Sequence, residues 1–148
     1  MVVSDKKIFS IGQIFPLIGE ANGANNIIDG YHLSLNTFNL LLFKKLGRTC
    51  CICGLNGIFF AINKEQSKFR KNKIKKSTRL TLWGIDNRDR KIKMTVDHIM
   101  PKSRYPELKN NFCVMCKDCN NHKRDLPMNE FLNTNYVKNK LQQKVSYI

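Results

Sequence analysis

Two short stretches near the C-terminal end indicate the fold, Val96-Asp97-His98-Ile99-Met100-Pro101 and Cys116-Lys117-Asp118-Cys119-Asn120. The first places an acid–histidine pair at the end of a strand-like run, and a loop containing proline follows it. A short strand-like run beginning at Asn111 leads to the second, where a Cys-x-x-Cys turn opens a helix with Asn120. We expect the rest of the chain to support this unit.

A second Cys-x-x-Cys pair occurs far upstream, because Cys50 and Cys53 have the same spacing as Cys116 and Cys119. Four thiolates make a closed tetrahedral zinc site, and a closed site is structural because it leaves no position for a substrate. We therefore predict one structural Zn²⁺. Six cysteines could instead form three disulfides, but their clustering favours metal binding in a reducing compartment, hence a cytoplasmic protein.

The register of the second pair needs a choice, because Cys113 and Cys116 are also separated by two residues. We favour Cys116 with Cys119, since these two lie in the turn just before the helix, whereas Cys113 falls within the strand. Cys51 and Cys113 are then expected to be small buried hydrophobic residues, which is the commoner fate of a free cysteine.

The ordered set Asp97-His98, Asn111 and Cys116-x-x-Cys119-Asn120-x-x-Lys123 resembles the core of the HNH endonucleases. In that family an acid or histidine followed by histidine ends one strand, asparagine opens the next, and asparagine or histidine begins the helix. The resemblance spans about residues 48–132. It implies an α+β fold with a ββα-metal (His-Me finger) core and a structural zinc, to which we add an N-terminal helical extension and a C-terminal helix.

The same resemblance implies a role for each residue in hydrolysing a phosphodiester bond. His98 suits general base catalysis because histidine is mostly neutral at pH 7. Asp97 and Asn120 offer hard oxygens to a catalytic Mg²⁺, for which Mn²⁺ can substitute. Asn111 is expected to brace the loop and help orient the base. Lys123, on the same helix face as Asn120, is expected to hold the scissile phosphate.

His122 is an alternative third active-site residue, because His98, Asn111 and His122 would then supply the histidine, asparagine and histidine of the name HNH. It is two residues from Asn120, about 200° around a helix, so we expect it to face away. The family's last ligand position falls on Asn120, directly after Cys119. His32 has no partner pattern and is expected to be structural.

The charge predicts a polyanionic partner, because 26 Lys+Arg stand against 11 Asp+Glu and the net charge is +15. A merely soluble basic surface is the alternative. Residues 64–79 form a basic arm that is either a solvated loop or a segment that tracks the phosphates of double-stranded DNA. The predicted DNA contacts are basic side chains of this arm and of the helix end: Lys68, Arg70, Lys71, Lys73, Lys75, Lys76 and Arg124.

A membrane partner is not expected, because neither an amphipathic basic helix nor a lipidation signal is present. The apolar stretch 8–18 is too short to span a bilayer and is interrupted by Gln13 and Pro16. Cleavage of a signal peptide near Ala21 remains an alternative to a folded N-terminal element.

Three regions are expected along the chain. Residues 1–46 form an N-terminal helical segment with helices over 8–18 and 36–46 and a loop over 20–30; Asn36 caps the second helix and Gly47 stops it. This segment packs on the core or contacts DNA. Residues 47–132 form the nuclease domain, with strands over 57–63, 80–83, 91–96 and 111–115, a helix over 120–125 and a helical turn over 129–132. Residues 133–148 form a C-terminal amphipathic helix.

Together these features predict a metal-dependent DNA endonuclease that nicks or cuts both strands, leaving 5′-phosphate and 3′-hydroxyl ends by the family's chemistry. A zinc-stabilised DNA-binding module without catalytic activity is the alternative from another class. A nuclease or binding protein directed to RNA is a third possibility, which a comparison of substrates would distinguish.

Overall fold

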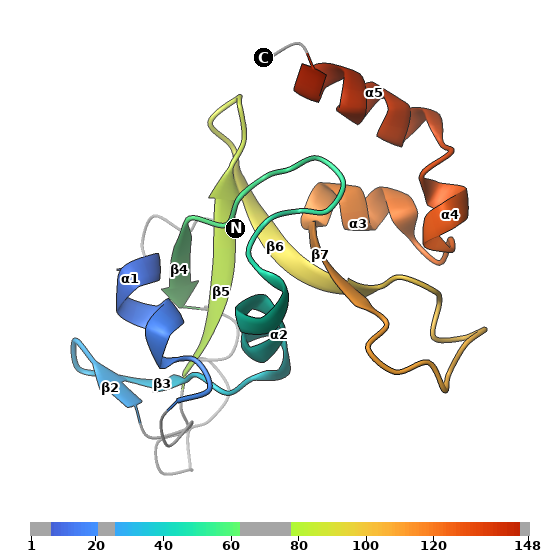
Figure 1. The fold of residues 1–148 in the computed structure, drawn as a ribbon. Helices are drawn as coiled ribbons and strands as arrows, with labels where there is room; N and C mark the ends of the chain where they lie inside the picture. Colours follow the sequence, from blue (N-terminus) through green and yellow to red (C-terminus); the bar gives the residue numbers. More distant parts are fainter. Residues whose placement is uncertain (1–6, 21–25, 63–77, 146–148) are drawn as a thin grey trace, which may run out of the picture.

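The computed structural model describes residues 7–20, 26–62 and 78–145, which form a mixed α+β fold around a largely antiparallel sheet (Figure 1). The strands are β1 (Ile8–Ser10), β2 (Asn26–Ile28), β3 (Tyr31–Ser34), β4 (Phe59–Ile62), β5 (Thr78–Ile85), β6 (Lys91–His98) and β7 (Phe112–Cys116). The helices are α1 (Ile11–Ile14), the 3-10 turn η1 (Phe15–Leu17), α2 (Phe38–Leu46), α3 (Lys117–Lys123), α4 (Met128–Phe131) and α5 (Asn135–Val145). The expected α+β class is confirmed at this level.

Strand β5 is the centre of the sheet, because three other strands pair with it. It runs antiparallel to β4, with Phe59 opposite Trp83, and antiparallel to β6, with Trp83 opposite Lys93. Its first residues pair in parallel with β3, with Leu33 opposite Thr78. The order β1–β4–β5–β3–β2 completes the sheet, and β6 and β7 extend from it. The strands predicted around 57–63 and 80–83 are therefore present.

Strand β6 carries the acid–histidine pair away from this sheet. Its first three residues pair with β5, and the five residues from Met94 to His98 pair with β7. As predicted from their alternation, Ile92 and Met94 are buried, and Val96 packs against the same core. Helix α3 begins after Cys116, which pairs with Met94, and runs back along β6, so that Lys123 reaches His98 at the strand's end.

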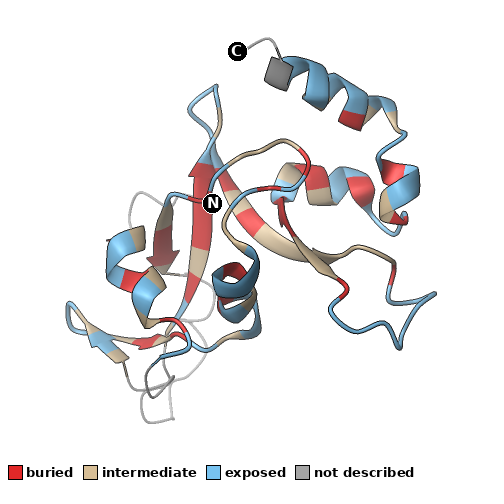
Figure 2. Ribbon diagram, viewed as in Figure 1, coloured by how far each residue is buried: buried red, intermediate tan, exposed pale blue. Residues whose placement is uncertain are grey.

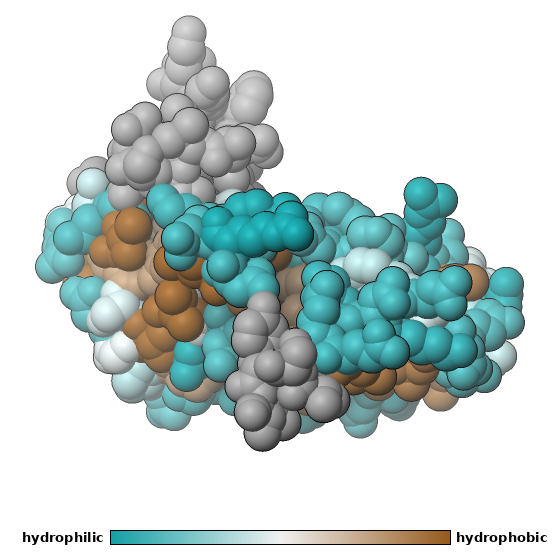
Figure 3. Space-filling model, turned by 90° about the horizontal axis from the view of Figure 1, so that it is seen from above, coloured by the Kyte–Doolittle hydropathy of each residue, from teal (hydrophilic) through white to brown (hydrophobic). Residues whose placement is uncertain are grey.

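The main core lies between the sheet, α1, α2 and the hairpin, where the ribbon of Figure 2 is red. Seen from above, hydrophobic residues gather on the surface near α1 and β4, and the side with α3, α4 and α5 is mostly hydrophilic (Figure 3). Ile8 of β1 and Ile58 before β4 are among the exposed large hydrophobic residues. Among the described residues, no helix has the length and apolar character needed to cross a bilayer.

The helix predicted over 8–18 is wrong in its first part, where the chain forms β1. That strand pairs with β4, with Phe9 opposite Phe60, so a partner distant in sequence overrides the local helical spacing. Ser10 then caps α1: its hydroxyl accepts from the backbone N–H of Gln13, whose side chain accepts from the Ser10 N–H in return. The N-terminal segment is consequently part of the sheet and not purely helical.

The loop predicted over 20–30 is also wrong in its last part, where β2 and β3 form a hairpin. Asp29 and Gly30 join the two strands with φ values of 51° and 83°. Positive φ at both central residues is what a type I′ hairpin turn requires, and Asp-Gly is a common sequence for it. The dipeptide was a signal for this hairpin that the density of Asn and Gly obscured.

Helix α2 is present, but its cap is not Asn36. The hydroxyl of Thr37 accepts a hydrogen bond from the Leu40 N–H, and Asn36 Oδ1 instead accepts from the Gly19 N–H at 3.0 Å. The helix ends at Gly47 as predicted, with φ 103°.

Helix α3 begins at Lys117, three residues before the predicted start. Cys116 is its N-cap, so the Cys-x-x-Cys turn forms the first helical turn and Asn120 lies within the helix. The short helix α4 confirms the turn predicted at 129–132. Helix α5 occupies most of the predicted C-terminal helix.

Candidate functional site

The two Cys-x-x-Cys pairs come together. The sulfur atoms of Cys50, Cys53, Cys116 and Cys119 all lie within 4.8 Å of one another, and the Cys53 and Cys116 sulfurs are 3.7 Å apart. Three of the four side chains are buried. Four converging thiols form a site that could hold a metal ion such as zinc. The choice of Cys119 over Cys113 is confirmed.

Local backbone hydrogen bonds shape the upstream half of this site. The Cys50 N–H donates to the Leu55 carbonyl at 2.8 Å, and the Gly54 N–H donates to the Cys50 carbonyl at 3.0 Å. Gly54 has φ 79°, a conformation that glycine adopts at little cost. The Cys51 N–H donates to the Val114 carbonyl, which ties the turn to β7.

Neighbouring thiols favour ionisation of the upstream pair. Hydrogen bonds from Cys116 and then Cys119 lower the pKa of Cys53 to about 7. The same two neighbours, Cys116 first, lower the pKa of Cys50. Contact with Cys119 instead raises the pKa of Cys116, and the pKa of Cys119 is also raised. Because the thiolate and not the thiol binds a metal, the lowered pKa values of Cys50 and Cys53 suit a ligand role.

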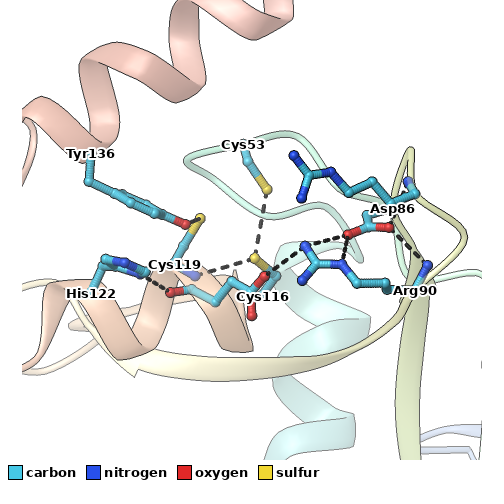
Figure 4. Close-up of polar contacts among 9 residues, drawn as sticks. Cys53, Asp86, Arg90, Cys116, Cys119, His122 and Tyr136 are labelled. Carbon is cyan, nitrogen blue, oxygen red and sulfur yellow. Dashed lines mark hydrogen bonds and ion pairs between the residues drawn. The ribbon is translucent and has the colours of Figure 1, made fainter.

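Helix α5 covers the other side of the cysteines (Figure 4). The Tyr136 hydroxyl donates to the Cys119 sulfur at 3.2 Å. The His122 ring stacks on Tyr136 with centroids 3.8 Å apart, and its Nδ1 lies 2.8 Å from the Asp118 carbonyl oxygen. The sequence analysis missed Tyr136. His122 lies toward α5, in the direction expected from its position two residues after Asn120.

Cys51 and Cys113 do not behave as expected. Cys51 is exposed and Cys113 is half-buried, so the prediction of two small buried hydrophobic residues is wrong for Cys51. The neighbouring Cys113 thiol is the largest cause of a raised pKa of Cys51. The hydrogen bond of the Cys51 backbone to β7 explains this pairing, because it aligns the upstream turn beside that strand.

At the end of β6, Lys123 is buried, with 1% of its surface exposed. Its ammonium donates to the His98 backbone carbonyl at 2.8 Å and lies 3.2 Å from Asp97 Oδ2. This placement disagrees with the prediction that Lys123 holds a phosphate, because the ammonium already has two partners inside the protein. The spacing correctly places Lys123 with Asn120, but that helix face packs on β6.

Asp97 Oδ2 is buried, and among the described residues no aligned hydrogen bond reaches it. The Lys123 ammonium is within ion-pair distance of this oxygen, but it donates its hydrogen bond to the His98 backbone carbonyl. The oxygen therefore has a cation beside it, the Lys123 ammonium, but no aligned hydrogen bond, which is unusual for a buried carboxylate.

Asn120 lies on the same face of α3 as Lys123. Its amide nitrogen donates to the Thr95 hydroxyl at 2.9 Å, and that hydroxyl donates to the Met115 carbonyl at 2.7 Å. Thr95 precedes Asp97 by two residues, so both side chains lie on one face of β6. The contact uses the amide nitrogen and leaves the carbonyl oxygen as the end able to bind a metal.

Asn111 fixes the loop after β6 and is buried. Its Oδ1 accepts from the Met100 N–H at 2.8 Å, and its amide nitrogen donates to the Met100 carbonyl at 2.7 Å. The Ile99 N–H also donates to the Asn111 carbonyl at 3.1 Å. These three bonds hold the chain that leaves His98.

The imidazole of His98 points to the other face of β6. Its ring lies 4.8 Å from that of its cross-strand partner Phe112, and Phe112 contacts Phe38 of α2. Among the described residues, no hydrogen bond joins this imidazole to Asp97 or Asn120. The structure therefore brings Asp97 and Lys123 together and places the His98 ring on the opposite side, at the last residue of the strand.

The remaining predicted residues are the proposed DNA contacts and His32. The side chains Lys68, Arg70, Lys71, Lys73, Lys75 and Lys76 of the basic arm lie outside the described residues. Arg124 is exposed and ends α3 with φ 52°. His32 lies on β3 opposite Ile27.

Comparison of the chain with protein-family models, curated proteins and solved structures finds no match.

Proposed function

We propose that this protein is a metal-dependent DNA endonuclease whose β6, β7 and α3 form a ββα-metal core of the HNH type. The observation that carries the proposal is the buried Asp97 Oδ2, which lacks an aligned donor at the end of a strand. A divalent cation bound to this carboxylate would share it with the Lys123 ammonium, which lies 3.2 Å away. The net charge of +15 supports a polyanionic substrate.

The residues present fit two different metals. The four thiols of the cysteine cluster would hold Zn²⁺ as a structural ion. Asp97 and the carbonyl oxygen of Asn120 offer hard ligands to Mg²⁺ or Mn²⁺, and Asn120 contacts Thr95, two residues before Asp97 on β6. When bound, such an ion stabilises charge on the phosphate and the leaving oxygen.

The chain's own residues divide the remaining work. His98 accepts a proton from the attacking water, since neutral imidazole is an effective general base near pH 7. Lys123 is a positioning residue in this proposal, because its ammonium holds both Asp97 and the His98 carbonyl. Asn111 fixes the following loop through Met100. Both residues limit movement of the segment that carries the base.

The alternative function, a zinc-stabilised DNA-binding module, has an observation of its own. Asp97 and His98 point to opposite faces of β6, and the ion pair with Lys123 partly neutralises the carboxylate. In an endonuclease this arrangement can still work, because both residues lie at the end of β6, where substrate can approach both faces of the strand. A binding module has no need of a buried carboxylate oxygen that accepts no hydrogen bond, as Asp97 Oδ2 is here, and we therefore favour the nuclease.

A plasmid-nicking assay with Mg²⁺ tests the proposal. The wild type should convert supercoiled DNA to nicked or linear DNA, and His98→Ala should lose roughly 10²–10⁴ in rate while binding DNA normally. His122→Ala is the matched control and should keep its activity. Asp97→Ala and Asn120→Ala should lose activity through the metal, so higher Mg²⁺ or Mn²⁺ should partly rescue them.

Full wild-type binding without any cleavage would favour the binding module. Cleavage of RNA but not DNA of the same sequence would reassign the substrate. If His122→Ala is inactive while Asn120→Ala is active, His122 is the third residue of the site.

A further inference from the structure

We propose that Phe38, the first residue of α2, is a stacking platform for an unstacked base of the bound nucleic acid. The ring is 60% exposed although Phe38 belongs to a helix that packs on the core. Leaving so much aromatic surface in water forgoes the free energy of burying it. The position therefore favours a partner that covers the ring.

One aromatic ring, that of Phe112, lies between this platform and the proposed general base. Phe38 packs edge-on against Phe112 with centroids 5.2 Å apart, and Phe112 lies 4.8 Å from the His98 ring. Because Phe112 and His98 are cross-strand partners, both rings lie on the face of the hairpin that meets α2. A base stacked on Phe38 would lie on the same side of the hairpin as the His98 imidazole.

The surroundings of Phe38 fit a nucleotide rather than an apolar protein segment. A groove of about 220 Å³ borders the ring. Apolar side chains such as Leu82 and Met94 line part of it, and its polar lining comes from Arg79 of β5, Lys93 of β6 and the start of α2. Aromatic side chains with cationic neighbours are the usual combination for binding a nucleic-acid strand, since the ring stacks on a base and the cations meet phosphates. The charge of +15 acts in the same direction.

This inference deepens the proposed endonuclease function and rests on it for the role of His98. It assigns to α2 the contact with a base close to the bond that is cut. The substrate class is DNA with a base that is unpaired or readily unstacked. A fully stacked duplex would bind less tightly, because inserting a side chain between base pairs costs unstacking energy.

The test measures binding of a 20-base-pair DNA duplex, fully paired or with one unpaired adenine, without added divalent metal. Phe38→Ala should weaken binding of the unpaired form by about 10-fold. Phe38→Trp should retain it, and its fluorescence should be quenched by DNA; the native Trp83 is only 7% exposed and gives a constant background. Ile27→Ala is the matched control, since Ile27 is 61% exposed on β2 and should have no effect.

Salt dependence separates stacking from charge. Phe38→Ala should leave the slope of log K against log salt unchanged, whereas Arg79→Gln and Lys93→Gln should each reduce it by about one. Wild-type affinity in folded Phe38→Ala, or an unquenched Phe38→Trp that still binds DNA, overturns the inference. Quenching without any cleavage supports the base contact and contradicts only the endonuclease. Cleavage that is independent of Phe38 contradicts only the platform.

Discussion

Lys123 illustrates at the residue scale how the end of β6 is held. A lysine is rarely fully buried unless its charge is paired, and here it meets one carboxylate and one carbonyl. Its removal would leave Asp97 in a largely enclosed position with neither a cation nor an aligned donor. The cost of leaving one partner of a buried ion pair uncompensated is large.

We therefore expect Lys123→Met to destabilise the protein by about 3 kcal/mol, measured by urea unfolding with zinc present. Methionine fills similar space, so the loss reports charge and not volume. Adding Asp97→Asn to the same chain should recover much of the stability, because the unpaired charge is then gone. Lys117→Met, at an exposed position of the same helix, should change stability by less than 0.5 kcal/mol, as roughly expected of surface sites. Equal effects of the two lysines would contradict the buried pair.

Sequence spacing predicts part of this site and not the rest. The cysteine pairs, Asn111 and the Asp97-His98 end of a strand follow from local patterns, because each is a fixed spacing beside a turn. Helical spacing also places Lys123 with Asn120. It does not say whether that face meets solvent or protein, and the packing of α3 on β6 decides this. Thr95 could have been found from its alternation with Asp97.

At the scale of elements, the turn carrying Cys50 and Cys53 packs closely on β5. A Cβ added to Gly84 would lie 2.5 Å from the Asn56 carbonyl oxygen and 2.9 Å from the Leu55 side chain. The backbone oxygen is part of the loop that also holds the cysteines, so it cannot move without displacing the upstream half of the candidate metal site.

Gly84→Ala should therefore destabilise the protein by roughly 1–3 kcal/mol, the range for overpacking. It should also weaken zinc retention in a competition with a chelator. Gly12→Ala is the matched control, because a Cβ there meets only the Ser10 hydroxyl at 3.9 Å within α1. Alanine should stabilise that helix slightly. A stable Gly84→Ala with normal zinc retention would show that the loop can adjust.

The turn between β5 and β6 depends on Asp86. Its carboxylate accepts from the backbone N–H groups of Arg88 and Arg90, both at 2.9 Å, and forms an ion pair with the Arg90 guanidinium at 2.8 Å. Burial alone would raise the pKa of Asp86, but these bonds outweigh it, so the pKa lies below its ordinary value. Arg90 also approaches Asp118 at the start of α3 (Figure 4).

Asp86→Asn should cost about 1 kcal/mol at pH 7, because Arg90 is exposed and its ion pair is screened. A carboxyl whose pKa is lowered by folding stabilises the protein above its unfolded pKa and loses this effect as pH falls through the folded one. The stability difference between wild type and Asp86→Asn should thus be constant above about pH 5 and shrink below pH 4. Unfolding midpoints across this range measure it. A difference that grows on acidification would contradict the lowered pKa.

Elements of the N-terminal segment were the least predictable, and the reason is physical. Strands β1 and β3 are short and are stabilised by β4 and β5, which lie far along the chain. Periodicity within 8–18 cannot reveal such pairing. Strands β5 and β6, by contrast, carry their own alternation of apolar residues, and α2 carries its own stop at Gly47.

At the scale of the whole molecule, the cysteine cluster connects parts of the chain that are distant in sequence. Cys50 and Cys53 follow α2, whereas Cys116 and Cys119 begin α3. A metal bound there fixes the start of α3, and therefore Asn120 and Lys123, relative to the sheet. In a chain of this size the total stability is about 5–15 kcal/mol, and binding of a structural zinc would contribute about 10–16 kcal/mol.

Loss of this metal should therefore unfold the protein. Cys116→Ser should lower the melting temperature by more than 10 °C, since roughly 1 kcal/mol shifts a domain of this size by several degrees. Metal analysis should find one zinc per wild-type chain and much less in the variant. Cys51→Ser is the matched control, because Cys51 adjoins Cys50 but lies outside the cluster, and it should keep both zinc and stability. A wild-type preparation that is fully folded without metal would refute the zinc assignment. A zinc-free Cys51→Ser would instead place that thiol among the ligands and reopen the choice of the second cysteine pair.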